Sequence, residues 1–286
     1  MPDLDCVEGV FINLDRAAER RAAMDKQLSE IRLPYPVGRF AGIDGLRQAG
    51  CPDGLLPGQY GCWLSHLRTI ERSLRSDRHL HVIEDDALLG RKLAVLPETL
   101  AALDLDSSWD ILYLDATLVE LPDMYRMFDW VQQARPQGRV HLHPIPAEFT
   151  VYGTHSYVVN SSRKKYVHDF LLSYLDAGVP IDNVLASGIQ KGQLKAYLTA
   201  PFLTSGDDRG LVSTVGYEGG ASFLAWLLFR RLCFSDLSEE AAAGLAARVA
   251  DLKPGLARSE ANFGALCAHR VAKWPNTRFT PRVERS

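Results

Sequence analysis

Short β-rich runs alternate with amphipathic stretches along the first two thirds of the chain. The run GVFINL at 9–14 precedes an apolar stripe from Ala17 to Ile31, which predicts a strand, a turn in which Asp15 caps a helix, and the helix itself. Further helices are predicted over 57–76 and from about 180. Further strands are predicted at 38–45, 79–89, 109–115, 150–160 and 194–203. This alternation predicts an α/β fold with a largely parallel sheet.

The texture of the chain changes after about residue 216. Helical patterns occupy 221–234, 236–252 (with a capping signal at Ser238) and 259–274, so we expect a domain over 1–215 and a helical appendage over 216–286. The apolar run FLAWLLF at 223–229 is too short to span a bilayer. A buried helix is the favoured interpretation of that run, and a contact with a membrane surface is the alternative.

Composition excludes several classes of protein. Hydrophobic residues make up 47% of the 286 residues and charged residues 23%, with a net charge of −3, so nothing indicates a nucleic-acid partner. The five cysteines are dispersed without CxxC spacing, which suits a reducing compartment. The first residues lack the pattern of a signal peptide, and we therefore expect a cytoplasmic protein.

Three consecutive acids follow a predicted strand. In extended backbone Glu84 and Asp86 project to one side and Asp85 to the other. Carboxylate oxygens suit Mn²⁺ or Mg²⁺, and such an ion would offset the repulsion within the triplet. In parallel sheets ligands bind beyond the carboxyl ends of the strands. The alternative is a solvated acidic turn.

Two other segments bear candidate binding residues. Asn13 and Arg16 lie in the first predicted strand–helix turn, and Arg20 and Arg21 follow on the helix. Such a turn can hold a nucleotide, although arginines on helices are more often solvated. Ser65 and His66 occupy an otherwise apolar helix, where a histidine is more often a satisfied core residue than a ligand.

Several motifs together resemble a known family. They are VFINLDRAAERR, RFAGIDG, GCWLSHLRTI, HVIEDDALL, WDILYLD, YGTHSYVVN and PIDNVL. In this order they resemble glycosyltransferase family 25, which includes lipooligosaccharide galactosyltransferases and collagen β-galactosyltransferases. The resemblance covers roughly 8–212 and leaves the C-terminal helices outside it.

The resemblance implies a GT-A-type fold with a mixed, mostly parallel sheet, a UDP-sugar donor (most often UDP-galactose) and inverting transfer to an acceptor hydroxyl. It makes Asp86 the direct ligand of Mn²⁺ or Mg²⁺, with Glu84 as a second candidate, and it gives Glu84 or Asp85 the ribose or a metal-bound water. His155 becomes a further metal or phosphate contact. The residues expected around the donor are Asn13, Leu14, Asp15, Arg16, Arg21, Ala41, Asp44, Gly45, Ser65, His66, Glu84, Asp85, Gly153, Thr154 and His155.

Inverting transfer also needs a base for the acceptor proton. Asp182, at the start of a predicted helix, is the first candidate, and its alternative role is a plain N-cap. Asp115 is the second candidate, and its alternative role is an ordinary acid at a strand end.

Other functions remain open at this point. Bacterial members of the family act on lipid-anchored glycans, which implies a glycan or glycolipid acceptor and peripheral contact with the inner membrane face. A nucleotidyltransferase or a phosphohydrolase also uses acids at strand ends, but no GxxxxGK[ST] loop or histidine-rich metal cluster occurs here. A catalytically inactive nucleotide-sugar-binding module is the third interpretation.

Overall fold

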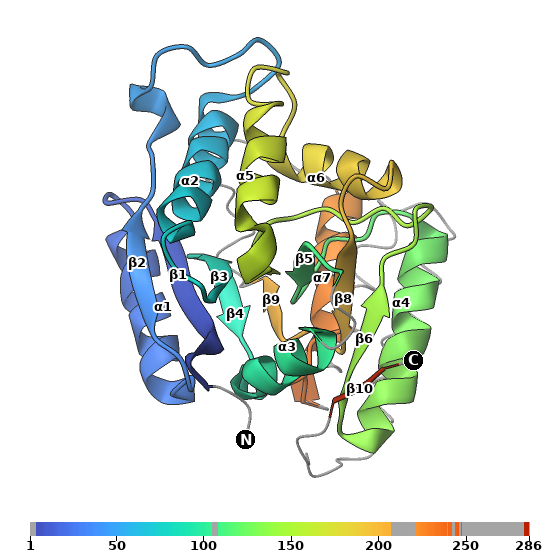
Figure 1. The fold of residues 1–286 in the computed structure, drawn as a ribbon. Coiled ribbons are helices and arrows are strands. Elements are labelled where there is room, and N and C mark those ends of the chain that lie inside the picture. Colours follow the sequence, from blue (N-terminus) through green and yellow to red (C-terminus); the bar gives the residue numbers. More distant parts are fainter. Residues whose placement is uncertain are drawn as a thin grey trace.

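A mixed β-sheet forms the centre of the protein (Figure 1). The structure is a computed structural model, and it describes residues 4–104, 108–206, 221–238, 240–241, 244–245, 247 and 283–285. Within these residues the sheet has eight strands in the order β10-β6-β8-β5-β7-β3-β1-β2. The strands are β1 (Val7–Asn13), β2 (Val37–Ala41), β3 (His79–Glu84), β5 (Ile111–Tyr113), β6 (Val140–Pro144), β7 (Ser156–Val159), β8 (Ala196–Ala200) and β10 (Val283–Arg285). A separate antiparallel ribbon pairs β4 (Ala87–Leu89) with β9 (Thr204–Gly206).

Helices cover both faces of the sheet. They are α1 (Ala18–Ile31), α2 (Pro57–Ser73), α3 (Leu96–Asp104), α4 (Leu121–Ala134), α5 (Lys164–Leu172), α6 (Ile181–Gln190) and α7 (Ala221–Leu232). One hydrophobic core lies between the sheet and α2, α4, α5, α6 and α7, and the other lies between the sheet and α1 and α3. Strand β5 shows the period of two: Ile111 and Tyr113 join the first core and Leu112 joins the second.

The sheet confirms the predicted α/β fold. It was expected to be largely parallel, and it contains both parallel and antiparallel strand pairs. Strand pairs β1–β2, β1–β3, β5–β8 and β10–β6 are parallel, while β3–β7, β5–β7 and β6–β8 are antiparallel. Strands were predicted near all of these positions except β6 and β10, and the predicted strand at 79–89 divides into β3 and β4. Helices α3, α4 and α5 were not predicted.

Helix α7 belongs to the main core. Leu228, Phe229 and Leu232 are buried there, which confirms the prediction of a buried helix for the end of the apolar run, whereas residues 225–227 are half-buried. Ser238 Oγ accepts a hydrogen bond from the Ala241 amide, as its capping signal predicts. Part of 236–252 and all of 259–274, which belong to the predicted appendage, lie outside the described residues. Within the described part of the chain, every helix is too short or too polar to cross a membrane.

The parallel arrangement of β2, β1 and β3 creates the edge at which the candidate residues meet. Asn13 is paired with Ala41, and Ile12 is paired with Glu84, so the carboxyl ends of all three strands lie side by side. The turns that leave β1, β2 and β3 therefore open onto one region of the surface.

Candidate metal and nucleotide pocket

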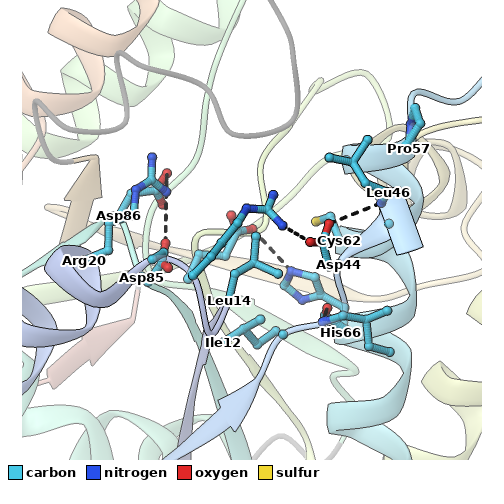
Figure 2. A pocket seen from close by; sticks show the side chains of 18 of the residues that line it. Ile12, Leu14, Arg20, Asp44, Leu46, Pro57, Cys62, His66, Asp85 and Asp86 are labelled. Atoms are coloured by element: carbon cyan, nitrogen blue, oxygen red, sulfur yellow. Dashed lines mark hydrogen bonds and ion pairs between the residues drawn. The ribbon is translucent and has the colours of Figure 1, made fainter. Parts of the chain in front are cut away.

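A pocket of about 300 Å³ opens at this edge of the sheet (Figure 2). Its walls come from the turn after β1, the loop after β2, the N-terminal half of α2 and the acids that follow β3. The lining residues are Ile12, Leu14, Arg16, Ala17, Arg20, Gly42, Ile43, Asp44, Gly45, Leu46, Leu56, Pro57, Gly58, Cys62, Ser65, His66, Glu84, Asp85 and Asp86. The volume lies at the lower end of the range typical of small-molecule sites.

The loop after β2 is held tightly against α2. A Cβ on Gly45 would lie 1.6 Å from the Pro57 carbonyl oxygen, and one on Gly61 would lie 2.5 Å from the Ile43 carbonyl oxygen, so neither position accepts a side chain. Ser65 Oγ accepts a hydrogen bond from the Ile43 amide at 2.8 Å and donates one to the Gly61 carbonyl at 2.6 Å. Ser65 thus fixes the wall of the pocket as well as lining it.

Asp85 is held on the α1 side of the acidic triplet. Its carboxylate accepts hydrogen bonds from Asn13 Nδ2 at 2.7 Å and from Arg20 Nη1 at 3.0 Å. Asn13 Oδ1 in turn accepts a bond from Arg39 Nε at 3.0 Å. Both Asp85 and Asn13 are buried, and their hydrogen bonds tie the ends of β1 and β3 to the first turn of α1.

Glu84 and Asp86 lie close together, and His155 joins them, although Asp85 and Asp86 form a turn after β3 and not the extended backbone that the predicted alternation assumes. One ligand atom from each of the three residues lies within 4.8 Å of the other two. The Glu84 amide donates to the His155 carbonyl at 2.8 Å, and Thr154 Oγ1 donates to Glu84 Oε1 at 2.5 Å. Gly153, with φ of 93°, provides the left-handed turn that brings the segment back toward β3.

Two atoms of this cluster have unused bonding capacity. Asp86 Oδ1 and His155 Nδ1 are buried and have no hydrogen-bond partner among the described residues. Arg20 Nη1 approaches only the other Asp86 oxygen, at 3.4 Å. A buried acceptor without a partner is costly, so these two atoms are candidates for contact with a ligand.

The charges within the cluster are unbalanced. Burial raises the pKa of Asp86, and the neighbouring carboxylates of Glu84 and Asp85 raise it further, although His155 and Arg20 oppose the rise. Burial alone would also raise the pKa of Glu84, but the close approach of His66, the charge of His155 and the Thr154 hydrogen bond lower it. A divalent cation would stabilise both carboxylates in their ionised forms.

The residues of this cluster fit a hard or borderline divalent ion. Two carboxylates and one imidazole nitrogen are ligands that Mn²⁺ accepts. Ligand atoms on one such ion lie at most about 4.2 Å apart, so small side-chain movements would bring the three atoms onto one centre.

Asp44 faces the acids from the opposite side of the pocket (Figure 2). It forms an ion pair with Arg16 and accepts a hydrogen bond from the Leu46 amide at 3.2 Å. The Arg16 partner lowers the pKa of Asp44. The ion pair joins the turn after β1 to the loop after β2.

Asp182 lies behind the Gly153–His155 segment and does not line the pocket. It is in the first turn of α6, where Pro180 is the N-cap, so the alternative of a plain N-cap is wrong. Its carboxylate accepts hydrogen bonds from the amides of Gly153 at 3.3 Å and Asn183 at 3.0 Å. Burial raises the pKa of Asp182, and nearby Glu84 adds to the rise.

Asp115 has a structural partner. Its carboxylate accepts hydrogen bonds from Nε of Arg230 at 3.1 Å and from Nη2 of the same guanidinium, and both side chains are almost fully buried. Asp115 is also absent from the pocket lining. A carboxylate held in this way cannot accept a proton from a substrate without breaking the pair, so Asp115 is a poor base.

Seven of the predicted donor contacts are not among the residues that line the pocket. Asn13, Gly153, Thr154 and His155 still contact its acids or the segment beside them, whereas the other three lie apart from it. Asp15 is exposed and pairs with Arg39, and it does not cap α1, whose N-cap is Ala17. Arg21 is exposed beside Asp25, four residues along α1. Ala41 is exposed at the end of β2.

Two residues that matter were not among the predicted site residues. Arg20 had been noted only as a helix arginine, but it contacts Asp85 and Asp86; its place in the first turn of the helix that follows β1 was the available signal. Cys62 lines the pocket one helical turn before His66, and only its i,i+4 spacing pointed to it. Burial raises the pKa of the Cys62 thiol, as do nearby Glu84, Asp182 and Asp86, so the free side chain is a neutral thiol.

Comparisons with known proteins add no family assignment. A search of protein-family models found no match to this chain, and neither did a search of curated protein sequences. The functional proposal therefore rests on the pocket and on the ordered motifs.

Proposed function

We propose that this chain is a metal-dependent, inverting glycosyltransferase that moves a sugar from a UDP-sugar to a hydroxyl of a glycan acceptor. UDP-galactose is the first donor to test, and a cell-surface glycan such as a lipooligosaccharide is the acceptor class. The observation on which the proposal rests is the Glu84–Asp86–His155 cluster, with its two unpartnered atoms, at the end of a pocket of ligand size.

The walls of the pocket suit a nucleotide. Apolar Ile12 and Leu14 line one part of it, and the backbone of the Ile43–Gly45 loop lines another. Arg20 adds a cation beside the acids. We assign the diphosphate to the Asp86 end, where Mn²⁺ or Mg²⁺ would neutralise its negative charge as it departs. The nucleoside then extends toward the Ile43–Gly45 loop.

Asp182 is the proposed base. In inverting transfer the acceptor oxygen forms a bond to the anomeric carbon while the bond from that carbon to the diphosphate oxygen breaks, and the acceptor proton passes to a carboxylate. Asp182 accepts a hydrogen bond from the amide of Gly153, two residues before His155, and its raised pKa favours proton acceptance. The pairing of Asp115 with Arg230 leaves Asp182 as the better of the two predicted acids.

Calorimetric titration of UDP tests the binding half of the proposal. We expect UDP to bind wild-type protein with Mn²⁺ and to bind much more weakly with EDTA. Asp86→Asn should remove the metal dependence, whereas Asp182→Asn should retain UDP binding. If wild-type protein fails to bind UDP under both conditions, the assignment of a UDP-sugar is wrong.

Product analysis tests the catalytic half. Wild-type protein with Mn²⁺, UDP-galactose and glycan acceptors should release UDP and form a glycoside of inverted anomeric configuration. Asp182→Asn should lower turnover by about 100-fold or more, since a general base contributes roughly 10²–10⁴-fold. Metal-dependent UDP binding without transfer to any acceptor would instead indicate a binding module, and release of UMP would indicate a different nucleotide-processing reaction.

A further inference from the structure

A second group of potential metal ligands lies next to the first. Cys62 Sγ, His66 Nε2 and a Glu84 carboxylate oxygen all lie within 4.8 Å of one another. Cys62 and His66 are four residues apart on α2, so their side chains lie on the same face of the helix. Figure 2 shows Cys62 and His66 on α2 at the pocket. Glu84, the last residue of β3, lies close to both, and all three residues line the pocket.

His66 is oriented in the manner of a metal ligand. Only 1% of the residue is exposed, and its Nδ1 lies 3.0 Å from the hydroxyl of buried Tyr157, with the two rings stacked at 5.8 Å. Metal-binding histidines usually have their second nitrogen fixed by such a partner. Tyr157 therefore fixes the ring so that Nε2 is directed into the pocket.

The Nε2 atom has no satisfied hydrogen bond among the residues that the structure describes. It lies 3.3 Å from Glu84 Oε1 without the geometry of a hydrogen bond. Glu84 Oε1 already accepts a hydrogen bond from Thr154. A nitrogen and a carboxylate oxygen that face each other in this way, with a thiol alongside, form a donor set for a cation.

We propose that Cys62, His66 and Glu84 form a second cation site, which takes Zn²⁺ or a similar thiophilic divalent ion. Sulfur, imidazole nitrogen and carboxylate oxygen are the ligands that zinc uses in tetrahedral sites, and three protein ligands leave one position for water. The Glu84–Asp86–His155 cluster lacks sulfur and suits harder ions. The two sites differ in ligand softness and share Glu84.

Sharing Glu84 makes the two sites competitive. An ion bound to Cys62 and His66 draws the Glu84 carboxylate away from Asp86 and His155, so Zn²⁺ should weaken Mn²⁺ binding. This competition would make thiophilic ions inhibitors of the proposed glycosyltransferase. The zinc site itself does not depend on that function, and only the inhibition does.

Cobalt provides a direct probe, because a thiolate bound to Co²⁺ gives a charge-transfer band in the near ultraviolet. Titration of the full-length wild-type protein with Co²⁺ should produce this band, and added Zn²⁺ should remove it. Cys62→Ser should abolish the band. Cys51→Ser is the matched control: Cys51 is also half-buried, but its Sγ is 3.5 Å from the Leu55 carbonyl, outside both clusters, and the band should persist.

Zinc affinity, measured by competition with a chromophoric chelator, gives a graded readout. Tyr157→Phe removes only the group that orients His66 and should weaken binding about 10–100-fold. Cys62→Ser removes a ligand and should weaken binding more than Tyr157→Phe does. Circular dichroism checks that each variant is folded, and Cys62→Ala replaces Cys62→Ser if serine destabilises the helix.

Three results would overturn the proposal. They are the absence of a thiolate band in folded wild-type protein, a band that survives in Cys62→Ser, and a zinc affinity that Cys62→Ser leaves unchanged. The last result would place the ion on Asp86 and His155 instead.

Asp86→Asn separates this proposal from the proposed function. This variant should lose Mn²⁺-dependent UDP binding but keep the cobalt–thiolate band. If wild-type protein shows the band but never binds UDP, the zinc site stands and the glycosyltransferase assignment fails. If wild-type protein binds UDP with Mn²⁺ but shows no band, the proposed function stands and the zinc site fails.

Discussion

Asp86 and Asp115 both follow a central strand of the sheet, but their surroundings differ. Asp115 is 2% exposed in its side chain and shares two hydrogen bonds with the buried guanidinium of Arg230. The Asp86 side chain is 14% exposed, has one long contact with Arg20, and leaves Oδ1 without a partner among the described residues. One acid has a buried ion-pair partner within the fold, although Arg230 Nη1 has no hydrogen-bond partner among the described residues, whereas the other acid leaves a buried oxygen of its own without one.

The difference shows how a buried acid at a strand end can be interpreted. A carboxylate whose partner is built into the fold contributes to structure, and its removal should damage the fold. A carboxylate that the fold leaves incomplete costs stability and is better explained by a ligand. Position in the sequence does not distinguish the two cases, because the partner of Asp115 lies 115 residues away on α7.

The largest effect should come from breaking the buried ion pair of Asp115 with Arg230. Asp115→Ala leaves the Arg230 guanidinium buried without its counter-ion, which should lower the free energy of unfolding by about 3–5 kcal/mol. Urea denaturation followed by circular dichroism measures this change. The double variant Asp115→Leu with Arg230→Met removes both charges and should lose much less. If the double variant loses as much free energy of unfolding as Asp115→Ala, the unpaired charge of Arg230 is not the cause of the destabilisation.

Metal bound at Asp86 should stabilise the folded protein. Mn²⁺ at about 100 times its dissociation constant should stabilise the wild-type protein by roughly 2.7 kcal/mol. Asp86→Asn should remove this gain, and Asp115→Asn should retain it because Asp115 is not a ligand. Thermal unfolding with and without Mn²⁺ gives the comparison. Equal gains in wild-type protein and Asp86→Asn would locate the ion elsewhere.

Without metal, Asp86 should reduce stability as the pH rises. Its pKa is higher in the folded protein than its ordinary value of 3.8, so between these two values the folded state binds more protons than the unfolded state. Stability then falls with increasing pH, by at most about 1.4 kcal/mol per pH unit for one proton.

The difference between Asp86→Asn and wild-type protein isolates this effect, because other titrating groups largely cancel. In EDTA the stability of the variant relative to wild-type protein should increase from about pH 4 upward. Above the raised pKa of Asp86 this stability difference should become constant. Denaturation midpoints measured across this range test the sign. An advantage that shrinks with rising pH would mean that the folded protein stabilises the ionised Asp86.

The sequence predicted the positions of site residues where the order of strands along the chain determined them. The parallel strands brought Asn13, Asp44 and the acids to one edge. The alternation predicted for extended backbone does not hold beyond Glu84, because Asp85 and Asp86 form a turn and both approach Arg20 Nη1. Contacts between distant segments could not be predicted in this way. They include Arg230 with Asp115, Arg39 with Asp15, and Tyr157 with His66.

The smallest effect should come from the ion pair of Arg16 with Asp44 at the edge of the pocket. This contact is close, but the Arg16 side chain is 49% exposed, and water screens most of the attraction. A double-mutant cycle of Arg16→Gln and Asp44→Asn should give a small coupling energy, well below that of Asp115 with Arg230. The coupling should also decrease as salt is added, whereas that of the buried pair should change little. A coupling as large as that of the buried pair, and insensitive to salt, would mean that burial does not account for the difference between the acids of this fold.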